Sequence, residues 1–315
     1  MSHIILLALL PIFFVLLLGY TAGKWRKVDN THVGALNTVV MSYALPASLF
    51  AATAATPKQA MLAQWSLLLI LGCAMMLIHP LWYLLQRRVL RRPAGEAAVQ
   101  ALTVALPNFA AAGLPIVAAL LGPDKTVPVA VAIAAGALLP SPVTLALLEL
   151  AKGGEGAAQG SMAMRVARAM GHALRRPIVL APVFGTMLSL LQWPLPDVAA
   201  ASLRQIGQAA GGLALFVTGL ILSAQHFRLS ANTLLAVATI NVVRPLLALG
   251  IARLLGAPPE ITRIAVLMTA LPAGFFGILF GKNYGVNSEE AGSTIIASTV
   301  VSMFTLALAI GWLYG

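Results

Sequence analysis

Length, composition and charge exclude a water-soluble domain. The chain has 315 residues, of which 60% are hydrophobic and only 9% are charged, whereas a soluble domain is about 45–50% apolar. The apolar residues come in runs of about twenty, the length that crosses roughly 30 Å of hydrocarbon at 1.5 Å per residue. The net charge of +11 is spread over short connections instead of one basic stripe, so we expect no nucleic-acid partner.

The apolar runs predict ten transmembrane helices. In chain order they cover residues 4–22, 33–53, 64–85, 97–121, 127–150, 177–192, 204–223, 233–255, 261–281 and 290–314. The first run has no basic residue before it and no convincing cleavage site after it, so we expect a mature helix instead of a signal peptide. The predicted fold class is an all-α, multi-pass integral membrane protein.

Lysine and arginine gather on one side of this predicted membrane arrangement. Fourteen of the twenty lie in the odd-numbered connections, counted from the one between helices 1 and 2. Five lie in the even-numbered connections or at the helix ends beside them, and Arg244 lies inside helix 8. Positive connections stay in the cytoplasm, so both termini are expected in the periplasm of a bacterial inner membrane. The longest connection, residues 151–176, is Gly-rich and basic and is expected to be a cytoplasmic linker.

The chain repeats itself at a spacing of 165 residues. Pro80, Arg88, Pro93 and Pro107 fall on Pro245, Arg253, Pro258 and Pro272 without a gap. Each repeat holds five helices, and because five is odd the second copy must enter the membrane from the opposite side. The sequence predicts two inverted five-helix halves, residues 1–150 and 177–315. Transporters of this design bind substrate near mid-membrane, where discontinuous helices of the two halves meet.

Helices 4 and 9 carry matching helix breakers. They read L-P-N-F-A-A-A-G-L-P over residues 106–115 and L-P-A-G-F-F-G over residues 271–277. Proline removes a backbone donor and glycine relaxes the backbone, so we predict crossover breaks at Pro107, Pro115, Pro272, Gly274 and Gly277. Unpaired backbone groups are costly in hydrocarbon. We therefore expect a polar cavity where the breaks cross, with half-helix N-termini that suit an anion. The alternative is that these prolines only bend packed helices.

At these two segments the chain resembles the auxin efflux carrier family, which includes the plant PIN transporters and bacterial malonate-type carriers. The resemblance rests on Pro107-Asn108, Gly113-Leu114-Pro115 and the stretch 270–286, with Pro272, Gly274, Lys282 and Tyr284. It implies a scaffold of helices 1, 2, 6 and 7, a transport part of helices 3–5 and 8–10, and an elevator-like movement. It also implies a homodimer through the scaffold and a small organic anion, malonate or another carboxylate, as substrate.

Polar side chains within the predicted helices are candidates for contact with the anion. Asn108 can donate its amide to a carboxylate, or it can satisfy backbone groups freed by the break. Arg244 lies near mid-membrane, where a charge is costly and usually functional or paired. It can grip a carboxylate or donate to carbonyls of the broken helices. The predicted substrate-binding set is completed by Asn37, Ser42, Ser48, Asn241 and Gly113.

Three further residues are candidates for gating or proton relay. His79 occupies the repeat position of Arg244 and can relay a proton, since imidazole titrates near neutral pH, or can act as a structural hydrogen-bonder. Lys282 and Tyr284 are expected to be anchors at the membrane interface, and a gating role is the second interpretation.

Enzyme signatures are absent from the sequence. The five histidines lack metal-ligand spacing and no phosphate-binding loop is present, so we expect no catalytic residue, metal or cofactor. The prediction is a secondary carrier of a small organic anion, surrounded by membrane lipid. Two alternatives stay open, a sodium-coupled symporter of the bile-acid type and a membrane sensor that binds a ligand without moving it.

Overall fold

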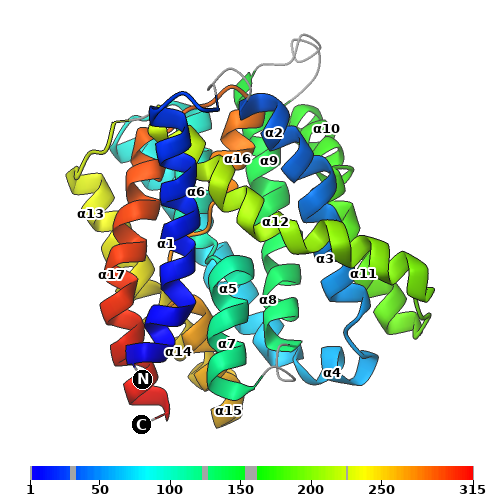
Figure 1. Cartoon of the computed structure of the whole chain (residues 1–315). Coiled ribbons are helices and arrows are strands. Elements are labelled where there is room, and N and C mark those ends of the chain that lie inside the picture. The colour runs from blue at the N-terminus through cyan, green and yellow to red at the C-terminus, as the bar shows by residue number, and fades with distance from the viewer. Residues whose placement is uncertain (1, 29–32, 123–126, 153–161, 225, 315) are drawn as a thin grey trace.

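The computed structural model describes residues 2–28, 33–122, 127–152, 162–224 and 226–314 (Figure 1). Every regular element within these ranges is a helix, and helices occupy each of the ten predicted stretches. The first half contains α1 (Ser2–Lys24), α2 (Val33–Val39), η2 (Val40–Ala44), α3 (Leu45–Ala54), α4 (Lys58–Ala63), α5 (Trp65–Leu84), η3 (Leu85–Val89), α6 (Ala94–Ala105), η4 (Phe109–Gly113), α7 (Leu114–Leu121), α8 (Val127–Leu138) and α9 (Pro140–Lys152).

The rest of the chain repeats much of this order. It contains α10 (Met162–Leu174), α11 (Pro177–Leu191), α12 (Asp197–Ser223), α13 (Ala231–Ala238), η6 (Thr239–Val243), α14 (Arg244–Leu254), α15 (Pro259–Thr269), α16 (Phe276–Asn283) and α17 (Glu289–Tyr314). The caps of α6 and α15 show the similarity in detail. Pro93 precedes α6 with φ −53° and ψ 148°, and Pro258 precedes α15 with φ −54° and ψ 147°.

Six helical stretches among the described residues are long and apolar enough to cross a membrane. They correspond to predicted helices 2, 3, 5, 7, 8 and 10. A seventh is added if α10 and α11, which are bent by 61°, form one span. The chain is therefore a helical, multi-pass membrane protein, and the number of ten spans stays a prediction.

Three of the π-helical turns, which are labelled η, end two residues before a proline. η2, η4 and η6 end one residue before the dipeptides Leu45-Pro46, Leu114-Pro115 and Arg244-Pro245. A proline inside a helix lacks an N–H and clashes with the carbonyl four residues earlier. The wider π turn accommodates both effects, so these helices continue through their prolines.

Close packing through glycine joins α1, α3, α11 and α12. Gly19 and Gly219 lie where α1 meets the backbone of α12, and a Cβ at Gly207 would lie 2.9 Å from the Cα of Ser48 on α3. α3 also packs against α11. Small residues allow helices in a membrane to approach closely, so these four helices form one packed group.

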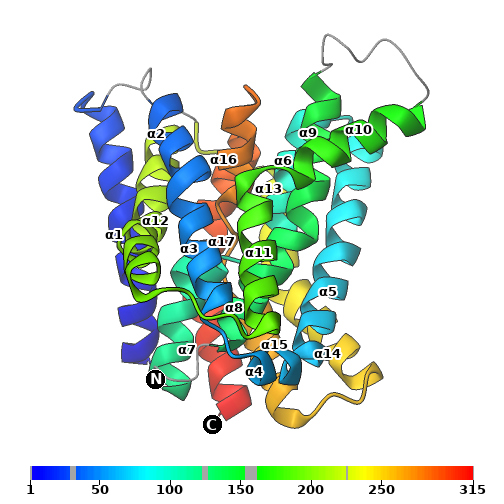
Figure 2. The same cartoon turned by 90° about the vertical axis from the view of Figure 1, so that its right-hand side faces the viewer.

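The second packed group surrounds α5 and α6. α5 packs against α6, α8 and α14, and α6 packs against α9, α16 and α17. The ends of α1, α9 and α16 all lie at the upper end of the molecule (Figures 1 and 2). Arg92, after η3, pairs there with Glu290 at the start of α17 at 2.9 Å. Most of the basic connections therefore belong to one end of the bundle.

The predicted linker is partly helical. Residues 162–174 form α10, which packs against α9, whereas residues 153–161 lie outside the described residues. Apolar residues recur at helical spacing among the Arg and His residues of α10 and give the helix one apolar face. Ala169 and Ala173, four residues apart, are buried on it. The predicted linker therefore contains a helix that packs on the end of the first half.

Candidate substrate site at the crossing of two broken helices

The two helix breaks lie directly against each other. The chain is not helical between Ala105 and Phe109, nor between Thr269 and Phe276. The N–H of Asn108 donates to the carbonyl of Pro272 at 3.0 Å, and the N–H of Gly274 donates to the carbonyl of Leu106 at 2.8 Å. These bonds form a short antiparallel bridge at the crossing. Each break therefore satisfies backbone groups that the other has freed.

Glycine is required at one position of this bridge. A Cβ at Gly274 would lie 2.8 Å from the carbonyl oxygen of Leu106 and 3.3 Å from that of Pro107. Those oxygens belong to the facing backbone, which cannot retreat without losing the bridge. Gly274 is thus a position of close backbone approach.

Two predicted breakers lie outside the breaks. Pro115 lies in the first turn of α7, directly after η4, and the wider π turn accommodates its missing N–H. Gly277 lies inside α16, and a Cβ there would lie 2.6 Å from the carbonyl oxygen of Val99 on α6. Gly113 ends η4 and faces the Leu271 side chain. The breaks are therefore centred on Pro107 and Pro272, while Gly277 allows α16 to pack on α6.

The guanidinium of Arg244 holds the crossing from one side. Its Nε donates to the Thr269 carbonyl at 2.8 Å, Nη1 donates to the Val104 carbonyl at 2.9 Å, and Nη2 donates to the Leu271 carbonyl. The side chain is completely buried. Of the two interpretations made from the sequence, bonding to carbonyls of the broken helices is the arrangement in this conformation.

The four half-helices meet with opposite polarity at the crossing. α6 and α15 end there, whereas the η4–α7 helix and α16 begin there. α6 and α16 lie toward one end of the molecule and α7 and α15 toward the other (Figure 2). Helix C-termini carry partial negative charge and N-termini partial positive charge. Arg244 donates hydrogen bonds to carbonyls at both C-terminal ends. The electric field that remains at the crossing therefore comes from the partial positive charges of the two N-terminal ends.

A small cavity lies beside these N-terminal ends. Its volume is about 20 Å³, which is room for about one water molecule. It is lined by Leu49, Leu106, Pro107, Phe109, Ile133, Gly136, Ala137, Ser141 and Phe276. The predicted polar cavity is therefore corrected to a small and mainly apolar one, because the breaks pair with each other instead of with water.

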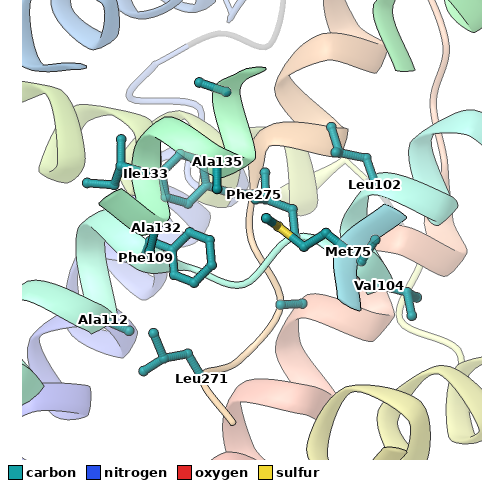
Figure 3. Close-up of a cluster of buried hydrophobic side chains, with 14 of the residues drawn as sticks. Met75, Leu102, Val104, Phe109, Ala112, Ala132, Ile133, Ala135, Leu271 and Phe275 are labelled. Carbon is teal, nitrogen blue, oxygen red and sulfur yellow. The ribbon is translucent and has the colours of Figure 1, made fainter. Parts of the chain in front are cut away.

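Apolar side chains enclose the crossing on several sides (Figure 3). They include Met75 of α5, Leu102 and Val104 of α6, Phe109 and Ala112 of η4, Ala132, Ile133 and Ala135 of α8, and Leu271 and Phe275 of the second break. Such surroundings strengthen any electrostatic interaction made at the crossing.

Two polar residues, Asn108 at the crossing and Ser141 at the cavity wall, are candidates for contact with the substrate. Asn108 is 5% exposed and its backbone forms the bridge. Ser141 lines the cavity and donates to the Gly136 carbonyl at 2.7 Å. Ser141 was not among the residues predicted from the sequence. Its signal was the Pro140-Ser141-Pro142 run, which begins α9 after the helix is interrupted at Leu139, in the middle of a predicted span.

Three other predicted substrate residues lie away from the cavity. Ser42 lines a separate groove between α3, α11 and α12, and Ser48 packs against Gly207 of α12. Asn241 donates to the Val237 carbonyl at 2.9 Å and accepts from Thr305 of α17 at 3.2 Å. In this conformation the second predicted helix faces the cavity through Leu49.

His79 is buried between α5 and α9. Its Nε2 lies 2.7 Å from the hydroxyl of Thr144, which donates to the Pro140 carbonyl at 2.9 Å. The hydroxyl must then accept from Nε2–H, so Nδ1 carries the lone pair. This geometry matches the structural interpretation of His79, and a proton-relay role stays a prediction.

The end of α16 is held by polar contacts with α2, which continues through η2 into α3 of the first packed group. The Asn37 amide on α2 donates to the Leu279 carbonyl at 3.0 Å and to the Asn283 side-chain oxygen at 2.9 Å. Asn37 therefore joins two helices instead of lining the cavity. Lys282 is half-buried in the last turn of α16.

Tyr284, directly after α16, lies between two charged groups. Its hydroxyl donates to Glu149 of α9 at 3.1 Å and accepts from Arg176 at 2.9 Å. The Arg176 guanidinium also lies over the ring, 5.5 Å from its centroid. Burial raises the pKa of the Tyr284 phenol, so the hydroxyl remains a donor at neutral pH.

Two broken helices that cross inside an apolar helical bundle are the architecture of a secondary transporter. The comparison with protein families agrees. The chain belongs to the Membrane transport protein family, whose profile matches residues 4–310. It is a membrane transporter and not an enzyme.

Its relatives include bacterial and plant transporters. "Uncharacterized transporter YfdV" of Escherichia coli (strain K12) is 27% identical over 97% of this chain and 96% of its own length. "Putative malonate transporter" of Rhizobium meliloti (strain 1021) is 27% identical over 94% of this chain and 92% of its own length. "Auxin efflux carrier component 8" of Arabidopsis thaliana is 25% identical over 39% of this chain and 34% of its own length. The resemblance to the auxin efflux carrier family is confirmed.

Proposed function

We propose that this transporter is an elevator-type carrier of a small organic anion, malonate or a related carboxylate. The observation that carries the proposal is the polarity of the crossing. Arg244 satisfies carbonyls of both helix C-termini, while two helix N-termini point toward the cavity beside Phe109 and Phe276. Helix N-termini favour carboxylates. The relative named as a malonate transporter supports this choice of anion.

The cavity volume implies that this conformation is closed to substrate. A cavity of about 20 Å³ has no room for a dicarboxylate, so Leu49 of α3 and the crossing must separate before substrate enters. We assign α1, α2–η2–α3, α11 and α12 to a scaffold. α5–α9 and α13–α17 form the moving unit, because the crossing, Arg244 and the cavity wall at Ser141 all belong to it.

The proposed topology has two inverted five-helix halves in a bacterial inner membrane. Basic connections follow α1, η3, α9 and α16. These connections all lie at one side of the predicted membrane arrangement. Positive connections stay in the cytoplasm, so this side is assigned to the cytoplasm and both termini to the periplasm. We also propose a homodimer formed through the scaffold.

Uptake of radiolabelled malonate into proteoliposomes tests the proposal. The native chain is assayed beside Asn108→Ala and, as a matched control, Asn241→Ala, whose amide is also buried but bonds within α13–η6 and to α17. A hydrogen bond to a charged group is worth about 1.5–3 kcal/mol. We therefore expect Asn108→Ala to reduce uptake by roughly tenfold or more and the control to reduce it by about twofold or less.

The same assay distinguishes the proposed carrier from the two alternative functions. Uptake that requires a sodium gradient favours a symporter of the bile-acid type, and malonate binding without counterflow favours a sensor. If no gradient supports uptake of malonate or of any competing carboxylate, the substrate assignment is wrong. Equal loss in Asn108→Ala and Asn241→Ala would remove Asn108 from the site.

A further inference from the structure

An apolar groove runs along α1, and none of its lining residues lines the cavity at the crossing. It is lined by Leu10, Phe14, Leu16, Leu17 and Tyr20 of α1 and by Ile296 of α17, and its volume is about 520 Å³. Figure 1 shows α1, in blue, beside α17, in red. Leu10, Phe14 and Leu17 are 57%, 65% and 57% exposed. The tyrosine hydroxyl is the one polar side-chain group among these lining residues.

The groove has the length of one membrane leaflet. Leu10 and Tyr20 are ten residues apart, which corresponds to about 15 Å along a helix. One leaflet contributes half of a hydrocarbon core that is roughly 30 Å thick. A lipid acyl chain therefore matches the groove in length and in chemistry.

Three cations lie at the Tyr20 end of the groove. Lys24 places its Nζ 5.6 Å from the centroid of the Tyr20 ring, and Arg26 and Lys27 follow in the exposed turn. Among the described residues, no carboxylate forms a salt bridge with any of the three. Trp25 between them is 73% exposed, which is typical of a residue at the headgroup level.

Backbone hydrogen bonds fix the turn that carries these cations. Arg26 has φ 52°, its N–H donates to the Gly23 carbonyl at 3.2 Å, and the N–H of Lys27 donates to the Ala22 carbonyl at 3.0 Å. This pattern is a Schellman motif, which terminates a helix with one left-handed residue. The cations therefore hold a defined position at the head of the groove.

We propose that this groove binds one anionic phospholipid of the leaflet on the Lys24 side. Its acyl chain lies along Leu10, Phe14 and Leu17 against Ile296, and its phosphate lies at Lys24, Arg26 and Lys27. Basic residues beside a membrane surface attract anionic lipid. The site goes beyond the proposed transport function and does not depend on the identity of the substrate.

The groove lies between the two packed groups of helices. α1 packs mainly onto α12, through Gly19 and Gly219, and α17 packs mainly against α13 and α6, while α1 and α17 also contact each other beside the groove. The bound lipid therefore fills the seam between the two packed groups on this side.

Lipid titration of the purified full-length protein, followed by native mass spectrometry, tests the proposal. Phosphatidylglycerol and phosphatidylcholine with identical acyl chains are compared. One variant is Lys24→Gln/Arg26→Gln/Lys27→Gln. The matched control, Arg88→Gln/Arg91→Gln/Arg175→Gln, removes the same charge from other exposed basic residues. A third variant, Ile296→Trp, fills the groove without changing the charge.

We expect the native chain to bind one phosphatidylglycerol roughly tenfold more tightly than phosphatidylcholine. The first triple variant loses this preference, the control triple variant keeps it, and Ile296→Trp weakens both lipids. Equal affinity of the native chain for the two lipids overturns the proposal, as does equal loss in both triple variants. Disulfide formation between two copies of Phe14→Cys in a bilayer also overturns it, because a second copy of the chain then occupies the groove.

Discussion

The crossing and the end of α16 are both held by hydrogen bonds, but they differ in what those bonds connect. At the crossing, Arg244, Asn108 and Gly274 join α14 to the two broken helices, all within the second packed group. At the end of α16, Asn37 and Arg176 reach from α2 and from the start of α11. Contacts inside one group can persist during a movement, whereas contacts between the groups must break. The crossing is therefore the rigid part of the proposed moving unit, and the end of α16 is its releasable attachment.

Replacement of Arg244 by Met is expected to have the largest effect. It leaves the carbonyls of Thr269, Val104 and Leu271 without their donor in a buried site, and each unsatisfied group costs about 1–3 kcal/mol. We expect a loss of stability of about 3 kcal/mol or more and no measurable transport. Thermal unfolding in detergent and malonate uptake measure the two quantities.

Arg244→Lys is the matched control for this prediction. An ammonium keeps the charge but cannot reproduce the planar arrangement of donors, so intermediate stability is expected. If Arg244→Met is as stable as the native chain and only uptake is lost, Arg244 contacts the substrate and does not hold the crossing.

Gly274→Ala tests the backbone bridge itself. Its Cβ would lie 2.8 Å from the Leu106 carbonyl oxygen, so the two breaks must move apart. Overpacking of this kind costs about 1–3 kcal/mol, and uptake should fall by tenfold or more, as thermal unfolding and proteoliposome assays will show. Gly250→Ala on α14 is the control, because a Cβ there meets no atom within 4 Å. Similar losses in both variants would mean that the bridge has no special role.

The positions of the breaks could be predicted from the sequence because their cause is local. Pro107 and Pro272 remove backbone donors wherever the chain folds, and their common spacing of 165 residues marks them as a pair. The partners of the freed groups could not be predicted. Direct pairing of the two breaks and the carbonyls chosen by Arg244 depend on how half-helices far apart in the sequence approach one another.

The side of each helix that faces the cavity could not be predicted from the sequence either. Ser42 and Ser48 were predicted at the site because they are polar and lie near Pro46, but the structure turns Leu49 toward the cavity. η2 adds to this uncertainty, since a π turn rotates every later residue relative to an α-helical count. Ser141 was missed because its Pro-Ser-Pro run has no counterpart in the repeat.

Asn37→Ala tests whether the end of α16 is the releasable attachment. It removes the donor to the Leu279 carbonyl and to Asn283, a net change of about 1 kcal/mol, which corresponds to roughly fivefold in an equilibrium. We expect nearly native stability but a larger population of open molecules. Maleimide labelling of Leu49→Cys in a Cys73→Ala background measures this opening, because Leu49 is 3% exposed here.

Thr38→Ala is the control for the labelling experiment. Thr38 is exposed and donates to the Gly34 carbonyl within its own helix, so its removal leaves α16 untouched. Unchanged labelling in Asn37→Ala, or a loss of stability as large as that of Gly274→Ala, would place Asn37 among the permanent contacts instead.

Tyr284→Phe is expected to have the smallest effect. It removes the hydroxyl that bonds Glu149 and Arg176 but keeps the ring beneath the Arg176 guanidinium. The Arg176 side chain is 48% exposed, and exposed charged contacts contribute about 1 kcal/mol or less. Opening of Leu49→Cys should therefore rise by about twofold without a change in thermal stability, while Tyr43→Phe, whose side chain is 62% exposed, changes neither. If Tyr284→Phe instead lowers stability without altering the opening, the hydroxyl braces α16 against α9 within the moving unit and its bond to Arg176 does not restrain the movement.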